Sequence, residues 1–163
     1  MPQIKAETGT GAAATPSPED LPKGLDPKSE YGLSVIGDMM GPKFEAGLRA
    51  SATSGKFASA ISQMAIEFAF ADAWGRPGLE RKQKSLIVIS LLIAQRQTAE
   101  LKNHVKIGVA NGLTVKELEE TLVQAAPYVG FPCIASATTA VIEALREIGQ
   151  EPDAKTAEER GLL

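Results

Sequence analysis

One segment near the middle of the chain constrains the fold more than any other. Residues 80–97, ERKQKSLIVISLLIAQRQ, begin with charged side chains and then become almost wholly apolar over 86–94. This run is far shorter than the roughly 20 residues that an α-helix needs to cross a bilayer. Its Ile, Val and Ser residues would suit a buried strand. Its length and its helical neighbours favour a central helix that is buried on all sides.

The residues before this segment follow a helical period. Two helices are indicated over 30–41, where Gly41 and Pro42 end the pattern, and over 42–51. In 55–75 the apolar residues recur at intervals of three and four, which predicts a further helix; they are Phe57, Ile61, Met64, Ala65 and Phe68. We interpret the aromatic residues at its end as core rather than as a cofactor site; they are Phe68, Phe70 and Trp74.

Cap and turn signals define the second half of the chain. A helix is expected over 98–112, with Gly112 as its left-handed C-terminal cap. Thr114 and Glu117 have the spacing of a capping box, which opens the next helix. Pro132 begins the last helix, whose small residues at 135–140 let another helix approach closely. Its apolar stripe comprises Ile134, Val141, Leu145 and Ile148.

These patterns predict one all-α domain of six or seven helices over residues 28–149, with no internal repeat. Residues 1–27 are rich in Ala, Thr, Pro, Gly and Ser, and we expect a disordered or loosely docked arm. Residues 150–163 form a polar tail that we expect to be frayed.

Composition limits the classes of function. The formal net charge of −3 argues against a nucleic acid or an anionic membrane as partner. With one cysteine, Cys133, the chain cannot form an internal disulfide, and a reducing compartment fits. The first ten residues lack an apolar signal region, so we expect a cytoplasmic protein. One cysteine and one histidine cannot assemble a usual metal site, and no acidic cluster indicates a site for a hard cation.

The only histidine of the chain, His104, lies one helical turn after Glu100. On a helix the two side chains share a face, and a carboxylate beside an imidazole favours the charged imidazolium, so the pair can act as a tuned proton donor. Spacing alone equally describes a solvated surface pair. The pair flanks the predicted buried line of the helix, at the border between core and solvent; this line comprises Leu101, Val105, Gly108 and Gly112.

Other polar residues are weaker candidates. Cys133 lies at a helix start, where the helix dipole can lower a thiol pKa. It has no partner at C-x-x-C spacing, and a small buried core residue is the better interpretation. Arg81 and Lys84 lead into the apolar segment as solvated charges, unless one of them reaches a pocket and holds an anion.

Three segments together carry a resemblance to a known family. They are WGRPGLERKQKSLIVISLLIA (74–94), ELKNHVKIGVANGLTVKELEETLVQ (100–124) and YVGFPCIASA (128–137). With these motifs the chain resembles the carboxymuconolactone decarboxylase family, part of the alkylhydroperoxidase D-like superfamily, over about residues 30 to 148. The combined motifs are specific for the family and less specific for its reaction. The resemblance implies the alkylhydroperoxidase D-like all-α fold.

Two departures from the family pattern bear on the reaction. The peroxidase branch carries C-x-x-C followed by x-x-x-H, and the corresponding positions before His104 are Gln97 and Glu100. The resemblance therefore implies no thiol relay. The decarboxylase branch usually has Arg at the position of Lys84, and Lys keeps the charge but loses the fork that binds a carboxylate through two hydrogen bonds. The substrate can therefore differ from carboxymuconolactone.

The resemblance implies a cofactor-independent decarboxylase, or a related lyase or isomerase, for a small lactone, aromatic or polyketide-type carboxylic acid. His104 would be the general acid, tuned by Glu100, and no metal or organic cofactor is implied. Residues in the matching segments would bind the substrate: Arg76, Lys84, Ser85 and Tyr128. Family members form rings built from trimers, so a homo-oligomer, trimer or hexamer, is expected. Two alternatives stay open, namely an alkylhydroperoxidase-like redox protein and a non-catalytic oligomeric binding module.

Overall fold

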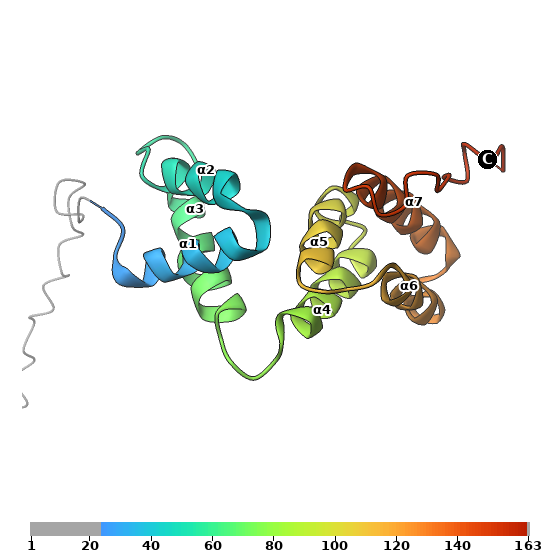
Figure 1. The fold of residues 1–163 in the computed structure, drawn as a ribbon, viewed down its shortest axis with the longest axis horizontal. Helices are drawn as coiled ribbons and strands as arrows, with labels where there is room; N and C mark the ends of the chain where they lie inside the picture. The colour runs from blue at the N-terminus through green and yellow to red at the C-terminus, as the bar shows by residue number, and fades with distance from the viewer. Residues whose placement is uncertain (1–23, 163) are drawn as a thin grey trace, which may run out of the picture.

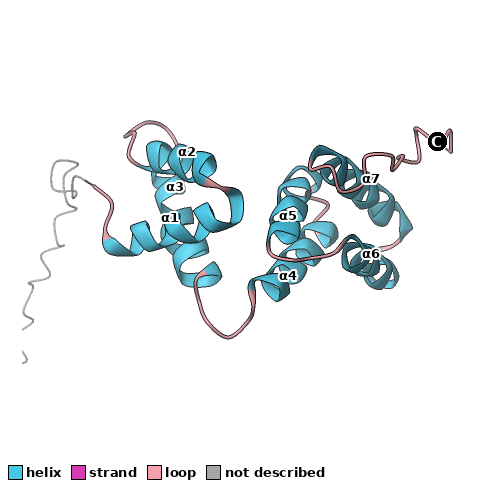
Figure 2. Ribbon diagram, viewed as in Figure 1, coloured by secondary structure: helices cyan, strands magenta, loops and turns pink. Residues whose placement is uncertain are grey.

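Helices account for the regular secondary structure of the described chain. The computed structural model describes residues 24–162 (Figure 1). Within this range it contains helices and loops but no strand (Figure 2), which confirms the all-α prediction. The expected N-terminal arm, 1–27, lies almost wholly outside the described residues. No helix within the described range combines the length and the apolar character that a membrane crossing requires.

The helices form two groups in chain order. The first contains α1 (Pro27–Met40), α2 (Pro42–Ala52), α3 (Ser59–Met64) and the π-helix η2 (Ala65–Trp74). The second contains α4 (Arg81–Ala94), α5 (Thr98–Ala110), α6 (Val115–Val129) and α7 (Phe131–Glu147). A loop over residues 75–80 leads from one group to the other (Figure 1).

The helix ends follow the local chemistry that the sequence predicted. In the capping box of α6, the Glu117 backbone N–H donates to Thr114 Oγ1 at 3.2 Å, and the Thr114 backbone N–H donates to the Glu117 carboxylate at 2.9 Å. Gly112 follows α5 with a φ of +93°, and Gly41 separates α1 from α2 with a φ of +86°. Because β-carbons are disfavoured at such φ values, glycine suits both positions.

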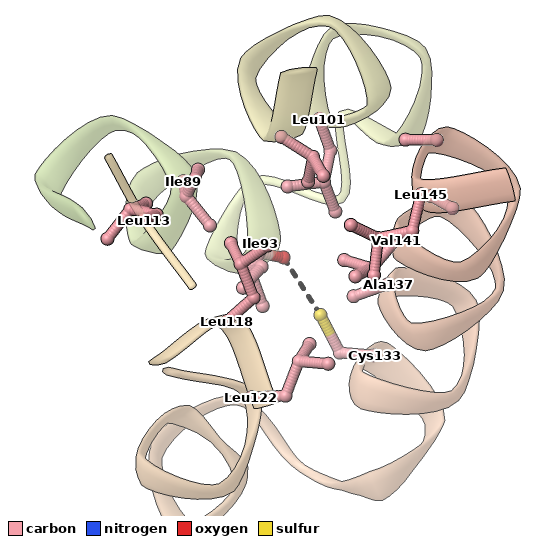
Figure 3. Close-up of a cluster of buried hydrophobic side chains, with 13 residues drawn as sticks. Ile89, Ile93, Leu101, Leu113, Leu118, Leu122, Cys133, Ala137, Val141 and Leu145 are labelled. Atoms are coloured by element: carbon pink, nitrogen blue, oxygen red, sulfur yellow. Dashed lines mark hydrogen bonds between the residues drawn. The ribbon is translucent and has the colours of Figure 1, made fainter. Parts of the chain in front are cut away.

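The larger core lies inside the second group of helices. Each of α4, α5, α6 and α7 turns one apolar face inward (Figure 3); the buried side chains include Ile89, Ile93, Leu101, Leu118, Leu122, Ala137, Val141 and Leu145. Cys133 is 3% exposed, and its thiol donates to the Ile93 carbonyl at 2.9 Å (Figure 3). The prediction of a small buried core cysteine is confirmed.

A second core lies where α1 packs against η2. It is formed by Leu33, Ile36, Ile66 and Trp74, and Ile107 of α5 also belongs to it. Gly32 permits the close crossing of these two helices, since a Cβ built on it would lie 2.2 Å from the Ile66 carbonyl oxygen. Through Ile107, the first group of helices packs on the second.

The predicted helix over 55–75 differs from the observed one in its winding and in its buried face. Residues 65–74 form a π-helix, whose hydrogen bonds span five residues instead of four. The wider turn directs Ile66, Ala71 and Trp74 into the core. Phe68 is 72% exposed, so the prediction that it is a core residue is wrong.

Helix α4 is also less enclosed than its composition predicted. Ser85, Ile89 and Ile93 face the core, whereas Ile87 and Leu91 are about half exposed at 49% and 53%. The expectation of burial on all sides is wrong because α5, α6 and α7 together cover only one side of this helix. An apolar face of α4 is therefore open on the chain as described.

The tail after α7 is held against that helix, so the expectation of fraying is wrong for its described part. Thr156 is buried, and its backbone N–H donates to the Glu159 carboxylate at 2.9 Å. The same carboxylate forms an ion pair with Arg146 of α7 at 2.8 Å. The polar composition of the tail did not predict these two specific contacts.

We expect Gly32→Ala to destabilise the protein by about 1–3 kcal/mol, because α1 and η2 must separate to admit the methyl group. Gly47→Ala is the matched control, since Gly47 lies in α2 with nothing within 4 Å of a built Cβ. This control should be neutral or stabilising by up to ~1 kcal/mol, as for Gly→Ala in an exposed helix. Urea unfolding of both variants measures the difference, and equal stabilities would contradict the crossing described above.

Candidate functional site

His104 lies at the border of the core, as its spacing predicted. Leu101 and Val105 on the same helix are 0% exposed, His104 is half-buried, and Glu100 is exposed. Helix α5 therefore presents the imidazole neither to the centre of the core nor to open solvent. This intermediate position suits a side chain that must meet a ligand in a desolvated place.

The ring of His104 stacks on the indole of Trp74. The two ring centroids are 6.2 Å apart and the ring planes make an angle of 15°. Trp74 is the last residue of η2 and is 9% exposed. The stack thus covers one side of the imidazole with an apolar surface, and it links the first group of helices to the second.

One nitrogen of His104 is buried without a hydrogen-bond partner. Among residues 24–162, Nδ1 of His104 is the buried side-chain nitrogen or oxygen for which no partner is found. Buried polar atoms in folded proteins almost always have a partner, and exceptions often mark functional sites. This nitrogen is therefore a candidate to exchange a proton or a hydrogen bond with a bound ligand.

Burial decides the protonation state of His104. Desolvation lowers the pKa of its imidazole below the ordinary value of 6.5, and the negative charge of Glu100 opposes this to a smaller extent. The ring is therefore neutral at pH 7 without ligand. Glu100 favours the charged imidazolium, as predicted, but desolvation of the ring outweighs it, because the carboxylate is exposed and screened by water while the ring has lost hydration.

The backbone that carries Trp74 is held by side chains from both helix groups. Lys84 Nζ donates to the carbonyls of Trp74 at 2.8 Å and Arg76 at 2.5 Å. The hydroxyl of Tyr31 donates to the Gly75 carbonyl at 3.0 Å. The carbonyls of residues 74–76, at and just after the end of η2, thus accept hydrogen bonds from side chains. No helical N–H is available to them there.

The other predicted binding residues lie at differing distances from this arrangement. Arg76 is in the same loop with an exposed side chain. Ser85 is 1% exposed, and its hydroxyl accepts a hydrogen bond from the Asn111 side chain at 3.0 Å. Tyr128 is 79% exposed and lines a groove of about 570 Å³ between α4 and α6. The lining of that groove does not include His104, so one chain does not bring these two residues together.

Residues 24–162 contain no group of three or more His, Cys, Asp or Glu side chains that could hold a metal ion. The chemistry available around His104 is that of its imidazole, the nearby Glu100 carboxylate and the Lys84 ammonium, which binds the carbonyl of Trp74.

Sequence reasoning missed the role of Trp74. We interpreted it correctly as a core residue, but nothing in the sequence connected it to His104, which lies 30 positions later. The π-helical winding of η2, which directs the indole inward, has no clear sequence signal. The one available hint was that a single tryptophan ends a helix directly before Gly75.

Comparison with known proteins indicates one family. Residues 59–143 match the sequence model of the carboxymuconolactone decarboxylase family. The chain is 35% identical over 106 residues to the nitrosuccinic acid decarboxylase of Metarhizium robertsii, covering 64% of this chain and 73% of that protein. It is 29% identical over 124 residues to the 4-carboxymuconolactone decarboxylase of Acinetobacter baylyi, covering 76% of this chain and 91% of that protein.

We predict that Glu100→Gln lowers the pKa of His104 further, because the carboxylate is the group that favours the imidazolium. His104 is the only histidine, so one imidazole resonance in a pH titration followed by NMR reports it without ambiguity. Glu119→Gln on α6 is the control and should leave the midpoint unchanged. An unchanged or higher midpoint in Glu100→Gln would show that the two side chains are not electrostatically coupled.

Proposed function

We propose a reaction from one premise: this chain belongs to the carboxymuconolactone decarboxylase family. It is a carboxy-lyase that acts on a small carboxylic acid or lactone, as both named relatives are decarboxylases of such compounds. The observation that carries the assignment of chemistry is His104, a half-buried imidazole with an unpartnered Nδ1 against an indole. We propose that this imidazole delivers the proton that replaces CO2.

The reaction requires an electron sink and a proton. When the bond between carbon and the carboxylate breaks, its electron pair passes into the conjugated carbonyl or other acceptor group of the substrate, and CO2 leaves. His104 then donates a proton to the resulting carbanion, which restores the neutral carbon centre. Since the substrate itself accepts the electron pair, we propose that no metal or organic cofactor is needed.

The neutral resting state of His104 fits this role when the substrate is an anion. A carboxylate bound beside the ring favours the imidazolium, as any opposite charge at close range does. Substrate binding and protonation of His104 are therefore coupled, and Glu100 assists by favouring the same charged form. The apolar surroundings of the ring also favour loss of charge from the carboxylate as CO2 departs.

The remaining predicted residues take supporting roles in the proposal. Arg76, with an exposed side chain, and Lys84, which keeps one ammonium N–H beyond its two carbonyl partners, would orient the anionic substrate. Ser85 would act from within the core, by holding the Asn111 side chain. Tyr128 lies on the separate groove, so it would reach a substrate at His104 only across a contact between subunits.

We propose that the chain forms a homo-oligomer, a trimer or a hexamer. Apolar side chains are exposed in rows on α3 and η2, at Ile61, Met64 and Phe68, and on α4, at Ile87 and Leu91. Contiguous apolar surface of this kind marks protein interfaces. A cytoplasmic location is also part of the proposal, supported by the single buried cysteine.

His104→Asn should lower the rate of CO2 release by ~10²-fold or more. The substrate for this assay is 4-carboxymuconolactone or nitrosuccinic acid, whichever the parent protein turns over. Asparagine fills similar space without a transferable proton, so helicity should not change. Cys133→Ser is the control and should retain turnover, because the thiol is buried on the Ile93 carbonyl. Full turnover by His104→Asn would remove the proposed role, and hydroperoxide turnover lost in Cys133→Ser would favour the redox alternative.

Leu91→Glu should yield a smaller assembly than the parent by size-exclusion chromatography with light scattering, because a carboxylate cannot be buried unpaired in an apolar interface. Leu162→Glu changes another exposed leucine, in the tail, and should leave the assembly intact. A parent protein that is strictly monomeric would contradict the proposed oligomer.

A further inference from the structure

The end of η2 is held in an unusual way for a helix terminus. The carbonyls of residues 74, 75 and 76 each accept a hydrogen bond from a side chain, two from Lys84 of α4 and one from Tyr31 of α1. Gly75 fits between these groups because a Cβ built on it would lie 2.6 Å from the Tyr31 ring and 2.5 Å from the Ala71 carbonyl oxygen. The backbone around Trp74 is thus fixed from two sides.

The fixed backbone aims the indole at His104. Trp74 is both the residue whose carbonyl Lys84 binds and the residue whose ring stacks on the imidazole. Its side chain is buried in the core shared by α1, η2 and Ile107 of α5. A displacement of residues 74–76 would therefore move the surface that shields His104 from water.

We propose that Trp74 is a positioning residue for His104, and that Lys84 and Tyr31 act on His104 through it by holding the backbone at the end of η2. The indole keeps water from one side of the imidazole and sets its orientation in the absence of substrate. This inference adds to the proposed function, in which His104 is the proton donor, but it concerns the ligand-free protein and is tested without turnover.

Few charged groups act on the His104 ring, so the packing of the Trp74 indole is the main control on the hydration of the imidazole. Glu100, on the same helix, is the charge that acts noticeably on the imidazole. Several other charged groups of neighbouring elements form their own ion pairs: Lys102 with Glu143 and Lys106 with Glu147 between α5 and α7, Lys28 with Asp72 between α1 and η2, and Arg81 with Asp38 between α4 and α1. The Glu67 carboxylate of η2 accepts hydrogen bonds from Ser29 and Gln63, and the Arg76 side chain is exposed. Lys84 of α4 donates to the backbone.

The composition of the chain makes the test direct. It has one tryptophan and one histidine, so fluorescence reports Trp74 and the imidazole NMR resonance reports His104 in the intact chain. In the parent, a charged imidazole against the indole quenches its emission, so the emission intensity and the imidazole resonance should titrate with one midpoint. Emission that does not change across the imidazole titration would overturn the proposal.

Variants separate positioning from charge. Tyr31→Phe removes one hydroxyl and no charge, and it should shift the emission maximum of Trp74 to longer wavelength and raise the His104 midpoint as water reaches the ring. Lys84→Met should do the same to a greater extent, and Lys84→Arg, which keeps the donors, should restore the parent values. Lys82→Met is the matched control, since Lys82 pairs with Glu117 on α6, and it should change neither signal.

The outcomes are distinct. If Tyr31→Phe and Lys84→Met fold with parent helicity and keep the parent emission maximum and midpoint, the proposal is overturned. If Lys84→Met does not fold, Tyr31→Phe alone decides. Neither signal needs substrate, so the two proposals can fail separately. An inactive parent protein would contradict the proposed function and leave this inference intact. Unchanged signals in the variants of an active protein would contradict this inference and leave the proposed function intact.

Discussion

The contact between the Trp74 indole and the His104 ring is the interaction on which the proposed chemistry depends. It lies where the first group of helices meets the second, so it requires α1, η2, α4 and α5 to be placed together. Gly32 permits the close crossing of α1 and η2, and the π-helical winding of η2 directs the indole inward. Hydrogen bonds from Lys84 and Tyr31 then fix the carbonyls beside it.

In the proposed function, the stack helps one imidazole to serve as the proton donor in a chain without other histidines. Burial makes the charged ring unfavourable until an anion arrives, and the lowered pKa expresses this preference. A substrate carboxylate would supply the missing negative charge, so that the imidazole takes up from solvent the proton that the reaction later consumes. The proposed coupling would therefore favour anionic substrates over neutral ones.

Much of the fold was predictable because helix boundaries are set by nearby residues. The capping box at Thr114 and Glu117 and the positive φ of Gly112 depend on a few neighbouring atoms, and both were read correctly from the sequence. The burial of a whole helix face, in contrast, depends on segments that are distant in sequence. Phe68 was predicted to be buried and is exposed, because a π-helix does not follow the period of 3.6 residues. Helix α4 was predicted to be enclosed, but the other helices of the same chain cover only one of its sides.

The candidate site was predictable only in part for the same reason. The border position of His104 followed from the apolar pattern of its own helix, but the direction of its pKa shift depends on burial of the ring in the folded chain, where Trp74, a residue remote in sequence, stacks on it. The family resemblance supplied the reaction class, and the comparisons support it. The partners of Lys84 are two backbone carbonyls, which no side-chain motif records.

The most direct test of the account compares two pH dependences of the same imidazole. The profile of kcat/KM for CO2 release reports the free enzyme, and the NMR titration of His104 in the ligand-free protein gives its midpoint independently. If protonated His104 is the required acid, kcat/KM falls as the pH rises through that midpoint, which lies below 6.5. A value of kcat/KM that stays constant while the imidazole loses its proton would contradict the central claim.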